Sequence, residues 1–277
     1  MMQAEILLPT MDKAKSKAGV LCLRTMIDDP QQYYLYIPDK TGPETKLFIT
    51  IHGIKRKAKE HATKLLPYAK RHGVVLIAPL FPRGRFSDYQ QLGLSNKGIR
   101  ADLALNRIID EVGFITGVDS KKLYFFGYSG GGQFVHRYAM THPQNVARMV
   151  IAAAGWYTFP DYSINYPHGL KNAAKLFGKP FNPEHILKIP TCVLVGEQDV
   201  LQDKTLRKST FLNRQQGSNR IDRGRAWIQA MKETAKRYHL NTAYDFMVIP
   251  RSNHSFLHCM DKGKMGQAIF KFLFGSS

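Results

Sequence analysis

The stretch Leu123–Met140, LYFFGYSGGGQFVHRYAM, decides how this chain folds. The apolar run Leu123–Phe126 leads into a glycine-rich turn around Ser129. An amphipathic segment, Gly132–Thr141, then follows and stops before Pro143. This order predicts a buried strand, a tight turn and a helix. Small residues two before and two after the serine relieve crowding in a strained turn, which lets the hydroxyl project from the end of a sheet. The alternative is a glycine-rich turn with an idle serine.

Six further apolar runs are short and bounded by turn-forming residues. Continuous runs of this kind favour strands that are buried on both faces, as in a parallel sheet. The predicted strands are Tyr33–Ile37, Lys46–Ile51, Val74–Ala78, Met149–Ala154, Cys192–Val195 and Phe246–Ile249.

Amphipathic segments alternate with these runs. The remaining predicted helices are Ala58–Arg71, Ile99–Val112, Ala226–Tyr238 and Lys264–Phe274. This alternation predicts an α/β fold with a central, mostly parallel sheet flanked by helices. The chain of 277 residues suits a single domain spanning 1–277. Residues 157–190 interrupt the pattern after the sixth strand of the fold, and we expect them to form a small cap or lid. A basic stretch, Asp203–Arg225, interrupts it again.

Composition limits the class of protein. Apolar residues make up 44% of the chain, which is typical of a globular protein. No apolar run approaches the ~18 residues of a membrane span. The apolar stretch Ile6–Pro9 has no basic segment before it and is a poor secretory signal. Three cysteines without a CxxC pair predict neither a disulfide framework nor a zinc site, and favour a reducing, cytoplasmic location.

The net charge of +19 is unusual. Such a charge favours contact with nucleic acid, an anionic membrane or an acidic substrate. No nucleic-acid-binding motif accompanies it, so we favour a solvated basic surface over either of the first two partners.

A serine nucleophile needs an acid and a base, which we expect at the carboxyl ends of other strands. The run Cys192–Val195 is followed by Gly196-Glu197-Gln198-Asp199. Asp199 is the predicted acid, because it lies a turn beyond the strand end and can reach inward. Glu197 and Asp203 are the alternatives.

The base is predicted after the run Phe246–Ile249, which continues as Pro250-Arg251-Ser252-Asn253-His254. His254 is the predicted base. His258 is the alternative, although its position close to the last helix favours packing.

An oxyanion formed at Ser129 would need two backbone N–H donors. Gly130 follows the serine and supplies the first. The second is expected from the loop after Lys46–Ile51, where Gly53 lets the backbone approach and Ile54 N–H is the predicted donor. His52 is predicted to be structural.

The His-Gly turn at 52–53, GYSGG at 127–131, GEQD at 196–199 and Asn-His at 253–254 follow one another in an order that resembles the α/β-hydrolase superfamily. The resemblance runs from about Tyr33 to the C-terminus. It is strongest with single-domain esterases related to dienelactone hydrolases and polyhydroxybutyrate depolymerases. It implies an α/β-hydrolase fold and a triad of Ser129, Asp199 and His254, with no metal or organic cofactor. The basic stretch after the acid departs from the pattern.

Two groups of side chains are candidates for substrate binding. Trp156 and Tyr157 follow the strand Met149–Ala154 and could form an aromatic wall over the site, or simply pack a lid onto the sheet. Arg83 and Arg85 follow Val74–Ala78 and could bind a carboxylate or phosphate, although solvated loop arginines are the simpler interpretation. The cluster Lys55-Arg56-Lys57 could attract an anionic substrate, or form a charged surface where a helix begins.

These features predict an esterase that cleaves a small-molecule carboxylic ester, which could be anionic, through an acyl-enzyme intermediate. A peptidase or amidase with the same triad is the first alternative. A non-catalytic basic binding protein on a hydrolase fold is the second, because one fold hosts many functions.

Overall fold

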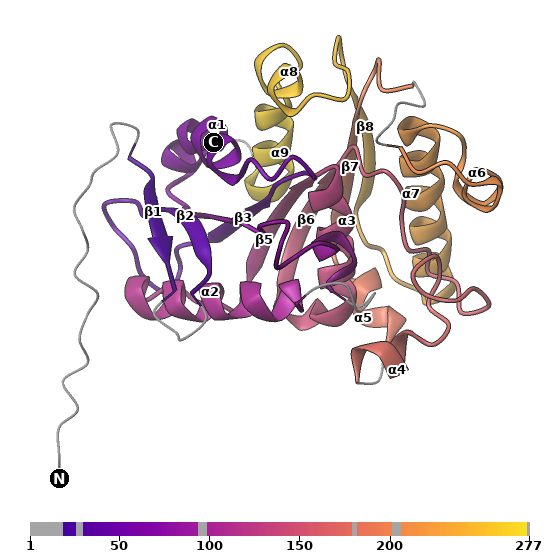
Figure 1. Ribbon diagram of the computed structural model, residues 1–277, viewed down its shortest axis with the longest axis horizontal. Coiled ribbons are helices and arrows are strands. Elements are labelled where there is room, and N and C mark those ends of the chain that lie inside the picture. The colour runs from indigo at the N-terminus through magenta and orange to yellow at the C-terminus, as the bar shows by residue number, and fades with distance from the viewer. Residues whose placement is uncertain (1–18, 26–29, 94–98, 179–181, 201–205, 276–277) are drawn as a thin grey trace.

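The computed structural model describes residues 19–25, 30–93, 99–178, 182–200 and 206–275. Within them the chain forms an 8-stranded sheet with the order β1-β2-β4-β3-β5-β6-β7-β8 (Figure 1). The strands are β1 Leu21–Arg24, β2 Gln32–Tyr36, β3 Leu47–Ile51, β4 Val75–Pro79, β5 Leu123–Tyr128, β6 Val146–Ala152, β7 Thr191–Gly196 and β8 Tyr244–Ile249.

The strands from β4 to β8 in the sheet order pair in parallel, whereas β1 pairs antiparallel with β2 and β2 antiparallel with β4. The prediction of a mostly parallel sheet is therefore confirmed. All seven predicted strands form, and their ends differ from the predicted ones by at most three residues. The first strand, β1, was not predicted, because its four residues, LCLR, are too short to show a periodicity.

Helices cover both faces of the sheet (Figure 1). One face packs on α1 and α9, and the other on α2, α3 and α7. The helices are α1 Ala58–His72, α2 Ala101–Thr116, α3 Gly130–Thr141, α4 Ala173–Phe177, α5 Pro183–Leu187, α6 Thr210–Gln216, α7 Arg220–Arg237, α8 Phe256–Asp261 and α9 Met265–Phe274, with 3-10 turns at Tyr89–Gln91 and Pro143–Asn145.

The core lies in two layers, one on each face of the sheet. Along β3, Leu47, Ile49 and Ile51 join the layer beneath α2 and α3, and Phe48 joins the opposite layer. Successive side chains of a strand point to opposite faces, so every position of a central strand must be apolar or internally bonded. This requirement explains why the predicted runs were continuous rather than alternating.

The basic stretch Asp203–Arg225 contains the start of a helix. We predicted that this helix would begin at Ala226, but α7 begins at Arg220. The Asn219 side chain caps it by accepting a hydrogen bond from the N–H of Asp222 at 2.9 Å. The prediction of the helix start was wrong because the many charged residues around Asn219 made its capping signal hard to recognise in the sequence.

The insertion at 157–190 contains α4 and α5. Figure 1 shows both helices at the opposite end of the sheet from α8. The first part of the insertion is tied to the neighbouring helices, because Thr158 Oγ1 accepts a hydrogen bond from Arg137 Nε at 3.1 Å and Trp227 Nε1 donates to Thr158 O at 2.8 Å. Its role as a cap or lid stays a prediction.

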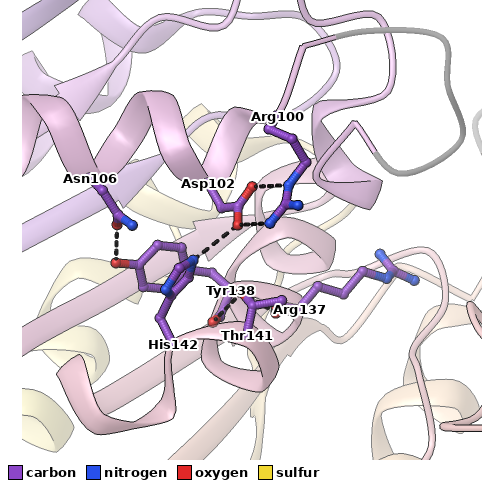
Figure 2. A network of polar contacts seen from close by, with 7 residues as sticks. All are labelled: Arg100, Asp102, Asn106, Arg137, Tyr138, Thr141 and His142. Carbon is purple, nitrogen blue, oxygen red and sulfur yellow. Dashed lines mark hydrogen bonds and ion pairs between the residues drawn. The ribbon is translucent and has the colours of Figure 1, made fainter. Parts of the chain in front are cut away.

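A buried polar network joins the start of α2 to the end of α3 (Figure 2). Asp102 is fully buried. Its carboxylate accepts two hydrogen bonds from Arg100, at 2.8 and 2.7 Å, and its Oδ2 lies 2.9 Å from His142 Nε2. Burial alone would raise the pKa of Asp102, but these partners outweigh it and lower the pKa to about 2. The network thus fixes two helices beneath the sheet.

None of the helices in the described ranges is both long and apolar enough to cross a lipid bilayer. The three cysteines are free; Cys22 is exposed, and Cys192 and Cys259 are buried. The Ile6–Pro9 stretch and the alternative acid Asp203 lie outside the described residues.

Candidate active site

Ser129 lies in the tight turn between β5 and α3, with a φ of 55° and a ψ of −114°. A non-glycine residue rarely adopts a positive φ, so this backbone is strained. The flanking glycines make the turn possible. A Cβ on Gly127 would lie 2.3 Å from the carbonyl oxygen of Gly131, and a Cβ on Gly131 would lie 2.0 Å from that of Ile51. The turn therefore requires both glycines of the sequence motif.

Three predicted side chains form a continuous chain of contacts. Ser129 Oγ lies 3.2 Å from His254 Nε2, and His254 Nδ1 lies 2.7 Å from Asp199 Oδ2. Asp199 is almost completely buried, with 2% of its surface exposed, while Ser129 retains 9%. A hydroxyl, an imidazole and a carboxylate in this order can activate an oxygen nucleophile.

The alternatives to this acid and base lie elsewhere. Glu197 is exposed and accepts a hydrogen bond from the N–H of Arg251 at 2.8 Å. His258 lies in α8, where its backbone N–H meets the Ser255 hydroxyl that caps the helix. Neither residue contacts Ser129 or His254 among the hydrogen bonds of the described residues.

The His254 ring is supported from one side by an aromatic residue. Tyr128, the residue before the serine, stacks on it with ring centroids 5.6 Å apart and an interplanar angle of 28°. Burial raises the pKa of Tyr128 well above its ordinary value, so the phenol stays neutral. Tyr128 therefore fixes the imidazole without adding charge.

The predicted oxyanion donors, the N–H groups of Ile54 and Gly130, belong to backbone segments that lie close together beside the serine. A Cβ placed on Gly130 would lie 3.4 Å from the nitrogen of Ile54, so the two backbones are close. Neither the Ile54 nor the Gly130 N–H donates a hydrogen bond to any residue in the described part of the chain. Neighbouring N–H groups without an acceptor can hold an oxyanion where both point at it.

His52 braces the loop that carries Ile54. Its Nε2 accepts a hydrogen bond from the N–H of Phe81 at 3.0 Å, which leaves Nδ1 as the donor to the carbonyl of Gly53, 2.9 Å away. Burial lowers the pKa of His52 to about 4, so the ring is neutral near pH 7. Tyr89 donates to the carbonyl oxygen of His52 at 2.8 Å and holds the same turn. These contacts fit the structural role that we predicted for this histidine.

A pocket of about 240 Å³ opens beside Ser129. Basic, acidic and aromatic side chains share its wall. Lys57 forms an ion pair with Glu60 at 3.0 Å, whereas Lys55 is exposed and forms no ion pair within the described residues. The lining residues are Gly53, Ile54, Lys55, Lys57, Glu60, His61, Tyr128, Ser129, His254, Ser255, Phe256 and Leu257.

The predicted substrate-binding residues do not line this pocket. Tyr157 is fully buried and stacks on Trp227, with ring centroids 5.0 Å apart. Trp156 is 4% exposed, and the guanidinium of Arg137 lies 4.1 Å from the centre of its ring. Neither residue forms a wall of this pocket, because Tyr157 belongs to the core and Trp156 packs against Arg137 of α3.

The two predicted arginines also lie away from the pocket. Arg83 is exposed. Arg85 is half-buried, donates to the carbonyl of Pro30 at 3.3 Å and lines a separate, smaller hollow of about 70 Å³. Sequence reasoning placed them near the serine because their loop follows a strand, but the length of the loop carries both side chains outward.

Sequence reasoning missed one residue that contacts the predicted acid. Arg220 Nη1 donates to Asp199 Oδ1 at 2.8 Å, and both side chains are buried, with 1% and 2% exposed. No motif signals this contact, because Arg220 stands among many other basic residues and is 21 positions from its partner. In the described ranges, no cluster of three or more histidine, cysteine or acidic residues is arranged to hold a metal ion.

Comparisons with known proteins agree with this fold. Residues 83–185 match the family model of the alpha/beta hydrolase fold. No curated protein sequence matches the chain. Among solved structures, poly(aspartic acid) hydrolase-1 from Sphingomonas sp. KT-1 is 25% identical with a TM-score of 0.78, covering 93% of this chain and 99% of that one.

Two further structures extend the comparison. A poly(3-hydroxybutyrate) depolymerase from Bordetella parapertussis is 23% identical with a TM-score of 0.74, covering 94% of this chain and 90% of its own. A proposed dienelactone hydrolase from Klebsiella pneumoniae is 17% identical with a TM-score of 0.55, covering 92% and 98%. The chain thus has the fold of the α/β-hydrolase superfamily and is similar to its esterase and depolymerase members, as the sequence motifs predicted.

Proposed function

We propose that this hydrolase cleaves carboxylic esters through an acyl-enzyme formed on Ser129. The observation that carries the proposal is the chain of contacts from Ser129 Oγ to His254 Nε2 at 3.2 Å and from His254 Nδ1 to Asp199 Oδ2 at 2.7 Å. The strained turn supports it, because it costs stability at the one residue that must expose a nucleophile.

The reaction runs in two halves. Ser129 Oγ attacks the ester carbonyl as His254 Nε2 takes its proton, and the N–H groups of Ile54 and Gly130 hold the oxyanion. The tetrahedral intermediate collapses, the C–O bond to the alcohol breaks, and His254 returns the proton to the departing alkoxide. A water molecule then attacks the acyl-enzyme with His254 again as base, releasing the acid and restoring Ser129. Asp199 stabilises the imidazolium in both halves.

The pocket suggests the class of substrate. Its volume of about 240 Å³ suits a short acyl group rather than a long chain. Lys55 adjoins the oxyanion donor Ile54 and has no ion-pair partner within the described residues, so it would favour a substrate that carries a carboxylate near the ester. We therefore propose a short-chain ester, with preference for an anionic one.

A second candidate is amide hydrolysis. The same residues can cleave amides, and the structural neighbour at 25% identity is a poly(aspartic acid) hydrolase. Lys55 at the pocket fits an acidic polypeptide as well as an anionic ester.

One set of assays tests these proposals. The p-nitrophenyl esters of acetate and of succinate are compared with an aspartyl p-nitroanilide, using the wild type and Ser129→Ala. We expect ester turnover that Ser129→Ala abolishes and a lower KM for the succinate ester than for the acetate ester, a difference that shrinks in 1 M salt. Equal turnover by Ser129→Ala would refute the nucleophile, and faster cleavage of the anilide would favour the second candidate.

A further inference from the structure

Arg220 is buried against the carboxylate that faces His254. One oxygen of Asp199, Oδ2, lies 2.7 Å from His254 Nδ1, and the other, Oδ1, accepts a hydrogen bond from Arg220 Nη1 at 2.8 Å. The exposed fractions of the Arg220 and Asp199 side chains are 1% and 2%, so water does not screen the pair. Both oxygens of the carboxylate are therefore held, which fixes its rotation.

The location of Arg220 is unfavourable for a cation. It is the first residue of α7, at the positive end of the helix dipole, where a cation is destabilising. Burial of a guanidinium adds a desolvation cost. Asn219 caps the helix independently through the N–H of Asp222. The helix start is therefore capped without the Arg220 side chain.

We propose that Arg220 is a positioning residue, which holds Asp199 in the orientation that directs its second oxygen at His254. The inference rests on the proposed function, because it assigns to Arg220 an effect on His254 as the base for Ser129.

Apart from His254 and Arg220, the titratable side chains near Asp199 in the described part of the chain come from β5, from the segment after β6 and from α8; they are Tyr128, Tyr157 and Cys259. Burial raises the pKa of each, so all three stay neutral near pH 7. Removing the guanidinium therefore takes a positive charge away from the Asp199–His254 pair.

The proposal also explains the basic stretch that follows the acid. Arg223, one turn after Arg220, is fully buried as well, but it bonds backbone carbonyls instead of the acid. Its Nη1 donates to the carbonyl of Gly155 and its Nε to that of Gly217, at 2.6 and 2.9 Å. Part of the positive charge in this stretch is therefore buried. Arg223 offers a matched control for Arg220.

The test is the pH profile of kcat/KM for a neutral ester from pH 5 to 9, in the wild type, Arg220→Gln, Arg220→Lys and Arg223→Gln. In Arg220→Gln we expect the maximum kcat/KM to fall about tenfold or more. We also expect the acid limb, the low-pH side of the profile where kcat/KM declines, to move to higher pH by about one unit. Arg220→Lys keeps the charge, and its acid limb should stay close to that of the wild type. Arg223→Gln should lose thermal stability without any shift of the limb.

An acid limb in Arg220→Gln that coincides with those of the wild type and Arg223→Gln would overturn the proposal, since a purely structural arginine lowers the amount of active enzyme and not the pH at which it works. Activity that persists in Ser129→Ala would instead overturn the proposed function, so the two failures are distinguishable.

A double substitution keeps the proposal testable if Arg220→Gln does not fold. Asp199→Asn/Arg220→Gln removes both buried charges, and we expect it to be soluble with a higher Tm than Arg220→Gln. If the double variant is as unstable as Arg220→Gln, the arginine acts independently of Asp199 and the proposal is wrong.

Discussion

At the scale of single residues, the site depends on a residue held in a backbone conformation that its type rarely adopts. Ser129 is held at a φ of 55°, which no serine adopts freely. Its neighbours at 127 and 131 have no room for a Cβ atom. The same turn brings Gly130 close to the backbone nitrogen of Ile54, from another loop. A strained turn at this point fits the proposed nucleophile and oxyanion donors.

The Ile54 N–H can be tested directly. Ile54→Pro removes this donor, and we expect kcat to fall about a hundredfold or more, because one oxyanion donor contributes roughly 3 kcal/mol to the transition state. Ile54→Val retains the N–H and serves as the control, with kcat within a few-fold of the wild type. Thermal unfolding of each variant would show whether the loop survives. Equal kcat values for the two folded variants would contradict the role of this N–H.

At the scale of elements, the sequence predicted the sheet well because buried parallel strands leave continuous apolar runs. The loops that carry Ser129, Asp199 and His254 could be located in the sequence for the same reason, because each follows a continuous apolar run. The direction of loop side chains could not be predicted. Tyr157 follows β6 as expected, yet it packs on Trp227. Arg220 could not be found at all, since its partner is set by the docking of α7 and not by any local pattern.

The network between α2 and α3 gives a prediction at this scale (Figure 2). The pKa of Asp102 is lowered to about 2 in the folded protein, from an ordinary value of 3.8. Its ionised form therefore contributes about 2 kcal/mol of stability above pH 4, which is lost as the pH falls towards 2. We expect Asp102→Asn to lower the free energy of unfolding at pH 7 by about 2 kcal/mol, measured by urea denaturation.

The pH dependence of catalysis provides the control for Asp102→Asn. Asp102 is not among the residues that line the pocket. The acid limb of the pH profile should therefore be the same in Asp102→Asn and the wild type. A shifted limb would show that the network acts on the site.

At the scale of the whole molecule, the charge of +19 is not only a surface property. Arg137, Arg220 and Arg223 are among the largest fully buried side chains. They bond carbonyl oxygens, a threonine hydroxyl, an asparagine side chain and the Asp199 carboxylate. Part of the positive charge therefore holds the fold and the site together. Contact with nucleic acid or membranes stays an untested alternative for the rest.

Buried histidines make the whole fold sensitive to acid. Burial lowers the pKa of His52 to about 4 and holds the pKa values of His61 and His136 well below 6.5. Unfolded histidines take up protons near pH 6.5, so stability is complete above that pH and is lost as the pH falls towards 4. Each proton contributes a slope of about 1.4 kcal/mol per pH unit.

We therefore expect the free energy of unfolding in urea to fall steeply between pH 6.5 and 5, and His61→Gln to reduce the slope by about one proton. A free energy that stays constant over this interval would contradict the assignment of these histidines as buried and neutral.

The proposed role of Ser129 as the nucleophile is tested most directly by the intact mass of the protein after reaction with a fluorophosphonate, followed by peptide mapping. We expect one phosphonyl adduct, located on Ser129, together with loss of ester turnover, and no adduct on Ser129→Ala. An adduct on another residue, or full turnover by protein that carries the adduct on Ser129, would contradict it.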